Sequence, residues 1–102
     1  MKLIQILLPT RDNAGRRFAG RRFQATAREL TERFGGLTAH TRAPVEGLWK
    51  PARRRTQHDD LVIFEVIAPR LDRRWWRTFR ERLERDYRQE KILTRVVDFS
   101  EV

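Results

Sequence analysis

Cysteine is absent from this chain, and only three of its 23 basic residues are lysine. Without cysteine there is no disulfide, no thiolate zinc site and no cysteine nucleophile. The one early apolar run, residues 3–8, is too short to cross a bilayer, and it lacks the apolar core and cleavage site of a signal peptide. No glycine-rich phosphate loop or serine-centred elbow occurs. These absences favour a cytoplasmic, bacterial-type protein with no membrane partner, and they imply no cofactor.

What the chain has in abundance is arginine, which makes up 20 of its 102 residues and gives a formal net charge of +9. Such a charge attracts phosphate backbones. The arginine excess also fits a GC-rich coding bias, and many of these residues lie near Asp or Glu at helical spacing, as on a solvated surface. Nucleic acid is therefore an alternative partner and not the favoured one. The arginines that would contact it are Arg16, Arg17, Arg21, Arg22, Arg53, Arg54 and Arg55.

The first half of the chain predicts a strand, a helix and a second strand. Residues 3–8 are apolar on both parities, apart from Gln5, which is typical of a strand covered on both sides. A helix is expected over about 19–34, where Gly35 and Gly36 end it. Residues 37–42 alternate weakly and predict an edge strand. The apolar stripe of the helix is Phe23, Ala27, Leu30 and Phe34.

The second half repeats this order after a long loop at 43–59, which is expected to be functional or partly disordered. Residues 61–67 form the strongest predicted strand, in which Glu65 is the only charge. Asp72 is placed to cap a second helix that runs to about residue 88. A last strand is expected over 92–99. The inward stripe of the second helix is Leu71 or Trp75, Phe79, Leu83 and Asp86 or Tyr87, with Trp76 at its margin.

Two strand–helix–strand units joined by a hairpin predict one α+β domain over residues 1–102. Its four-stranded antiparallel sheet carries both helices on one face, and right-handed crossovers place the first and third strands in the centre. The parity that faces the helices is Ile4, Ile6, Leu8, Val62, Phe64 and Val66. The opposite parity is Leu3, Gln5, Leu7, Leu61, Ile63, Glu65 and Ile67. Because the second set is too apolar for water, a homodimer with its sheets face to face is expected.

This element order and face pattern resemble the ferredoxin-like fold, and within it the dimeric α+β-barrel group, whose members range from small oxygenases to regulators. The resemblance implies a βαββαβ two-layer sandwich and a dimer, and it implies no single activity. A narrower similarity, in the segments 33–38 (RFGGLT) and 46–49 (EGLW), is to a family of small uncharacterised bacterial proteins. Ferredoxin-like RNA-recognition domains stack bases on aromatic side chains of the central strands. Here that face offers Gln5, Ile63 and Glu65 instead.

The sharpest candidate site lies on this second face. His40 and Arg42 are expected near Glu65, with Gln5 on the other side and Trp49 of the long loop as a lid. A carboxylate and an imidazole in an apolar cavity can act as an acid–base pair, so His40 and Glu65 are the candidate catalytic residues. The candidate ligand contacts are Gln5, Arg42 and Trp49. The alternative, which the pattern favours, is that these groups satisfy one another where two subunits meet.

The consecutive residues His58, Asp59 and Asp60 resemble metal ligands only superficially. Consecutive side chains rarely converge on one ion, and nothing else in the sequence supplies further ligands, so no metal site is predicted. The expected function is the binding of a small ligand in a sheet-face cavity of a homodimer. Sequence-independent binding of nucleic acid is the alternative, and whether the chain is an enzyme stays open.

Overall fold

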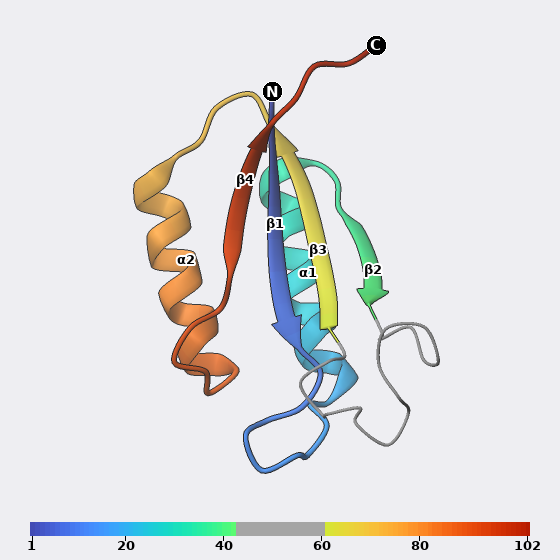
Figure 1. Ribbon diagram of the computed structural model, residues 1–102, viewed down its shortest axis with the longest axis vertical. Coiled ribbons are helices and arrows are strands. Elements are labelled where there is room, and N and C mark those ends of the chain that lie inside the picture. The colour runs from blue at the N-terminus through green and yellow to red at the C-terminus, as the bar shows by residue number, and fades with distance from the viewer. Residues whose placement is uncertain (43–60) are drawn as a thin grey trace, which may run out of the picture.

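The computed structural model describes residues 1–42 and 61–102 (Figure 1). The predicted loop at 43–59, with Trp49, Arg53, Arg54 and Arg55, lies outside the described residues. The elements follow the predicted order of strand, helix, strand, strand, helix, strand. Their bounds are β1 (Lys2–Pro9), α1 (Gly20–Phe34), β2 (Thr38–Arg42), β3 (Leu61–Ala68), α2 (Arg73–Asp86) and β4 (Thr94–Asp98).

The four strands form one antiparallel sheet in the order β2-β3-β1-β4 (Figure 1). β1 and β3 pair along their whole lengths, with Ile4 opposite Val66 and Gln5 opposite Glu65. Their central position agrees with the right-handed crossover rule. The chain is thus an α+β protein with a four-stranded antiparallel sheet and two helices, an arrangement compatible with the ferredoxin-like fold.

Both helices contribute to a single core on one face of the sheet. Successive side chains of a strand point to opposite faces, so every second residue of β1 and β3 reaches the helices. These residues join Leu30 of α1 and Trp76, Phe79 and Leu83 of α2 in one buried cluster. The prediction of which parity faces the helices is confirmed for Ile4, Ile6, Leu8, Phe64 and Val66, which are buried, and for Val62, which packs against them.

The ends of the helices follow from local signals in the sequence. α1 ends at Gly35, which has a φ of 77° and donates its N–H to the carbonyl of Thr31. Glycine adopts this left-handed conformation without the steric penalty of a Cβ atom. α2 begins after Asp72, whose Oδ1 accepts the backbone N–H of Trp75 at 3.1 Å. The predicted cap of the second helix is therefore confirmed.

The assignment of the paired tryptophans was wrong. Trp76 is buried in the core, whereas Trp75 is only partly buried. The inward face of α2 is centred on Trp76, Phe79 and Leu83, and Trp75 is turned about 100° from Trp76 around the helix. Its ring stacks on Phe79 at 4.8 Å and lies edge-on to Phe34, at the end of α1, at 5.4 Å between ring centroids. The guanidinium of Arg33 lies 4.3 Å from its ring.

Candidate functional site

A row of polar side chains crosses the outer face of the sheet, which is the face away from the helices. Glu65 of β3 stands opposite Gln5 of β1, and Gln5 stands opposite Arg95 of β4. Gln5 Nε2 donates to Glu65 Oε2 at 2.7 Å, and Arg95 Nε donates to Gln5 Oε1 at 2.7 Å. His40 of β2 extends the row, with Nε2 3.0 Å from Glu65 Oε1. We call these four residues the polar row.

Apolar side chains flank the polar row on both sides. One apolar row is Ile67, Leu3 and Val97, and the other is Ile63, Leu7 and Leu93. Ile63 is buried, but Ile67 and Val97 are 49% and 45% exposed. The outer face therefore presents hydrogen-bonded polar groups between two apolar borders. Both borders reach solvent, one at Ile67 and Val97 and the other at Leu93, which is 44% exposed.

The groups of the polar row largely satisfy one another. Each carboxylate oxygen of Glu65 has a hydrogen-bond partner, and both ends of the Gln5 amide are bonded. This is the usual state of polar groups that are withdrawn from water. The Glu65 side chain is 18% exposed, and that of His40 is 46% exposed. His40 is therefore the more accessible of the two candidate catalytic residues.

A shallow pocket of about 270 Å³ opens beside Glu65. Its walls are Glu65, Val66 and Ile67 of β3 together with residues 34–38, where α1 turns into β2. The cavity expected from the sequence lay between the sheet face and the loop that carries Trp49, which is outside the described residues. Arg42 ends β2 with its backbone opposite Leu61. Among the predicted residues, the structure brings Gln5, His40 and Glu65 together and adds Arg95, which the sequence analysis missed.

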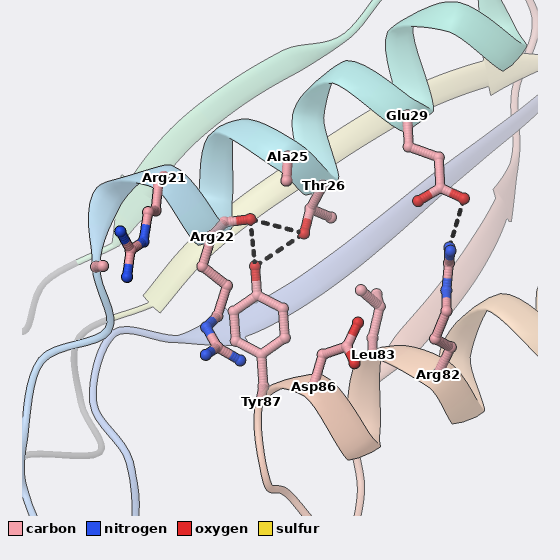
Figure 2. A pocket seen from close by; sticks show the side chains of 10 residues that line it. Arg21, Arg22, Ala25, Thr26, Glu29, Arg82, Leu83, Asp86 and Tyr87 are labelled. Carbon is pink, nitrogen blue, oxygen red and sulfur yellow. Dashed lines mark hydrogen bonds and ion pairs between the residues drawn. The ribbon is translucent and has the colours of Figure 1, made fainter.

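A second hollow, of about 560 Å³, lies between the two helices (Figure 2). Arg21, Arg22 and Glu29 of α1 face Arg82 and Asp86 across it, and Glu29 forms an ion pair with Arg82. Charges of both signs line this cleft, so much of its electrostatic field is balanced internally. No sequence pattern nominated the cleft, because its two walls are brought together only by the packing of α1 on α2.

Tyr87 lines this cleft, and its ring extends from the end of α2 toward Arg22 and Thr26 of α1 (Figure 2). Its hydroxyl lies 2.9 Å from Thr26 Oγ1 and donates to the carbonyl of Arg22 at 3.3 Å. Burial raises the pKa of Tyr87 above its ordinary value of 10.0, while the hydrogen bond with Thr26 and the charge of Arg22 act in the opposite direction. The phenol therefore stays protonated at neutral pH and acts as a structural hydrogen-bond donor.

The arginines proposed for nucleic acid lie around the start of α1. Arg16 and Arg17 precede the helix, Arg21 and Arg22 are in its first turn, and all four residues are exposed. The guanidinium of Arg22 lies over the ring of Tyr87 at 5.6 Å. This contact leaves Arg22 less free than its neighbours to bind phosphate. The other three proposed arginines, Arg53, Arg54 and Arg55, are outside the described residues.

Residues 1–42 and 61–102 contain neither a cluster of metal ligands nor a helix that could span a membrane. A metal site would require at least three acidic or histidine side chains close together, and these ranges contain no such group. Neither helix is long and apolar enough to cross a membrane. His58, Asp59 and Asp60 fall outside those ranges. No protein-family model matches the chain, and no curated protein matches it.

Proposed function

We propose that this chain is a ferredoxin-like protein of the dimeric α+β-barrel type that pairs through the outer face of its sheet and binds a small ligand there. The observation that carries the proposal is the open apolar row, in which Ile67 and Val97 are each almost half exposed. Apolar surface gains about 25 cal/mol for each Å² withdrawn from water. A second copy of the same face would cover this row, as in a two-fold interface.

The polar row supports the same arrangement. A polar group buried at an interface is costly unless it is hydrogen-bonded. Here the Glu65 carboxylate, the Gln5 amide and the Nε group of Arg95 are already bonded within one chain. The charges of Glu65 and Arg95 also have opposite signs, so these two groups add no net charge to a face that approaches its own copy. The outer face can thus lose water without leaving these bonded groups unpaired.

The pocket beside Glu65 is the proposed ligand site. Carboxylate oxygens accept hydrogen bonds, and a neutral imidazole can donate or accept one. A small molecule with hydroxyl or amino donors would therefore suit Glu65. His40 does not line the pocket, but it contacts Glu65 at 3.0 Å and is the more exposed of the two, so it is the second contact proposed. The same pair is the candidate acid and base if the bound molecule is chemically changed.

Sedimentation velocity at chain concentrations from about 10 to 100 µM tests the dimer. The wild type is expected to sediment as a dimer, whereas Ile67→Arg is expected to be a monomer with an unchanged circular dichroism spectrum. Arginine at this half-exposed position should disturb an interface without disturbing the core. The matched control is Thr78→Arg, which adds the same charge at an exposed position of α2 and should stay dimeric. A monomeric wild type over this range would contradict the proposed dimer.

Native mass spectrometry of the purified dimer tests the ligand site. The wild type is expected to carry a small-molecule adduct that is lost in His40→Ala and in Glu65→Gln while both variants remain dimers. Thr41→Ala, at an exposed position on the opposite parity of β2, is the control that should keep the adduct. If both site variants lose the dimer, these residues are structural. Absence of any adduct on the wild type would contradict ligand binding.

The alternative function, sequence-independent binding of nucleic acid, is supported by the exposed arginines at the start of α1. Helix N-termini also carry partial positive charge, which favours phosphate nearby. A test is the binding of a fluorescent DNA duplex by wild type and by Arg16→Ser/Arg17→Ser/Arg21→Ser at several salt concentrations. Each lost phosphate contact should lower the slope of log K against log salt by about one. An unchanged slope would contradict this alternative.

A further inference from the structure

The free edge of β4 and the groove beside it take no part in the proposed function. Among residues 1–42 and 61–102, β4 is hydrogen-bonded only to β1 and forms one end of the sheet. α2 lies beyond this edge and not over the middle of the sheet (Figure 1). A groove of about 230 Å³ separates the two elements. We call it the β4 groove, and its walls are Leu71, Arg73, Trp76, Arg77, Arg80, Thr94 and Val96.

The backbone of β4 has hydrogen-bonding groups on this side that no described residue uses. In an antiparallel ladder, alternate residues of an edge strand bond to the neighbouring strand, and those between them point outward. Leu7 N–H donates to the carbonyl of Leu93 at 3.0 Å, so Leu93 belongs to the inward set. Thr94, Val96 and Asp98 therefore direct their backbone N–H and C=O groups away from β1. Such an open edge is a template for another strand.

The side chains of the outward residues lead to the same groove. Thr94 and Val96 stand opposite Ile6 and Ile4, which lie on the helix-facing side of β1. Val96 is 39% exposed, although its neighbours on this parity are in the core. The Oγ1 atom of Thr94 is buried and has no hydrogen-bond partner. An added strand would cover the exposed Val96 side chain and could supply a hydrogen-bond partner for the Thr94 hydroxyl.

The charge of the β4 groove selects an acidic occupant. Arg73, Arg77 and Arg80 follow one another at helical spacings of four and three along α2, over a rise of about 10 Å. No carboxylate lines the groove, and none of the ion pairs recorded among the described residues involves these arginines. Alternate side chains of an extended strand are about 6.7 Å apart. Two acidic residues on one side of a strand would therefore lie within reach of the three arginines.

We propose that β4 accepts an extended acidic segment of a partner protein as a fifth strand of the sheet. Backbone hydrogen bonds to the outward residues of β4 would supply affinity, and carboxylates facing Arg73, Arg77 and Arg80 would supply selectivity. A second copy of β4 is a poor occupant, because its outward residues include only one acid, Asp98, and pairing would bring two arginine stripes together. Nucleic acid could use the arginines but would leave the backbone edge unpaired.

Fluorescence anisotropy with a labelled peptide of about twelve residues, alternating Glu and Thr, tests the proposal on the full chain. The expected dissociation constant is below about 1 mM. A peptide in which Lys replaces Glu should not bind. The decisive control carries N-methyl groups on its glutamates. In the added strand, the glutamates lie on the same face as Val96, and residues at these positions direct their N–H groups to β4. Methylation of the glutamate nitrogens therefore removes the donors that pair with β4 and keeps the negative charge. Binding of the methylated peptide should be at least about tenfold weaker, a loss of about 1.4 kcal/mol.

Variants of the protein separate the arginines from general charge. Arg73→Ser/Arg77→Ser/Arg80→Ser should weaken binding about tenfold. The matched control, Arg28→Ser/Arg74→Ser/Arg85→Ser, loses the same charge at exposed positions outside the groove and should bind within about twofold of the wild type. Val96→Pro should abolish binding because it removes an outward donor while leaving every bond between β4 and β1.

Several results would overturn the inference. They are no binding of the glutamate peptide at 1 mM, equal binding of its N-methyl form, and equal losses in the two arginine triples. If a single-stranded RNA displaces the peptide and binds the protein at a lower concentration than the peptide does, the groove is assigned to nucleic acid. A wild-type dimer that Val96→Pro converts to monomer would assign the edge to a second copy. The N-methyl comparison uses the wild-type chain, so it decides the question even if a variant fails to fold.

Discussion

The two faces of the sheet are built from alternating residues of the same strands, yet among the described residues only the helix side is closed along both central strands. On the helix side, Ile4 and Ile6 have no exposed surface, whereas Ile67 on the outer face remains half exposed. These residues have the same hydrophobicity. Their different burial shows that the layer packed against a strand, and not the residue type, decides how much of it leaves water.

The faces also differ in how they treat polar groups. The helix-facing residues of the two central strands include no polar side chain between Ile4 and Leu8 or between Val62 and Val66. The outer face has Gln5 and Glu65 in the middle of its strands, and each has a bonded neighbour. The first face is thus held by packing, and the second combines apolar borders with a hydrogen-bonded centre.

The largest expected effect compares one isoleucine from each face. Ile4→Ala should lower the free energy of unfolding by about 3 kcal/mol, because it leaves a cavity in a closed core. Ile67→Ala should lower it by less than about 1 kcal/mol, because the side chain is half exposed. Urea unfolding, at dilutions where sedimentation shows a monomer, measures both. Equal losses would mean that the outer face is already covered within a single chain.

The next effect concerns the polar row. Gln5→Leu should lower the free energy of unfolding by about 1.5 kcal/mol, despite the added apolar surface, because Glu65 and Arg95 each lose a partner. Urea unfolding is again the measurement. Gln24→Leu makes the same substitution at an exposed position of α1 and should change stability by less than about 0.5 kcal/mol. Stabilisation by Gln5→Leu would show that the outer face behaves as a simple apolar surface.

A smaller effect is expected inside the helix layer. Tyr87→Phe should cost about 1 kcal/mol by removing the hydroxyl that contacts Thr26 and the carbonyl of Arg22. Because the pKa of Tyr87 is raised in the folded state, its contribution is fully present below pH 10.0. It is lost as the pH rises from there through the higher folded pKa. The alkaline fall in stability should therefore be shallower in Tyr87→Phe.

Absorbance at 295 nm measures this titration directly, because Tyr87 is the only tyrosine of the chain. The folded protein should reach half ionisation at a higher pH than the urea-unfolded chain. Coincident titrations of the two states would contradict a buried phenol in the wall of the cleft.

The smallest effect is expected at an exposed ion pair between β1 and β4, at the end of the helix-facing rows of side chains. Lys2 and Asp98 stand opposite each other on β1 and β4 and form an exposed ion pair. The hydrogen bond and charge of Lys2 lower the pKa of Asp98 below its ordinary value of 3.8. Lys2→Gln should therefore raise that pKa, as followed by NMR of the carboxyl carbon. An unchanged pKa would show that the pair is not formed in solution.

The sign of the effect on stability follows from the lowered pKa of Asp98. The contribution of the pair is present above pH 3.8 and is lost as the pH falls through the lower folded pKa. Because both side chains reach solvent, added salt should weaken the contribution further.

The candidate site was only partly readable before the structure. The parity of the strands nominated Gln5, His40 and Glu65, because each interrupts or borders an apolar face. Arg95 was missed, since its place beside Gln5 depends on the register of β4 against β1. The prediction of which tryptophan is buried was wrong for a related reason. Both Trp75 and Trp76 contact Phe34 of α1, so which of the two rings is buried depends on how α2 packs on the sheet and on α1.

The sequence by itself determined the elements, their order, the end of α1 and the start of α2. The apolar runs of β1 and β3, the left-handed Gly35 and the Asp72 cap are all set by residues close together in the chain, so local sterics and hydrogen bonds suffice. The tertiary structure alone decided the polar row, the contact of Thr26 with Tyr87 and the groove beside β4. The polar row joins Gln5 to residues 60 and 90 positions away, and Thr26 lies 61 positions from Tyr87. No local rule sets such distances, because they depend on how the strands align and how two helices share one core.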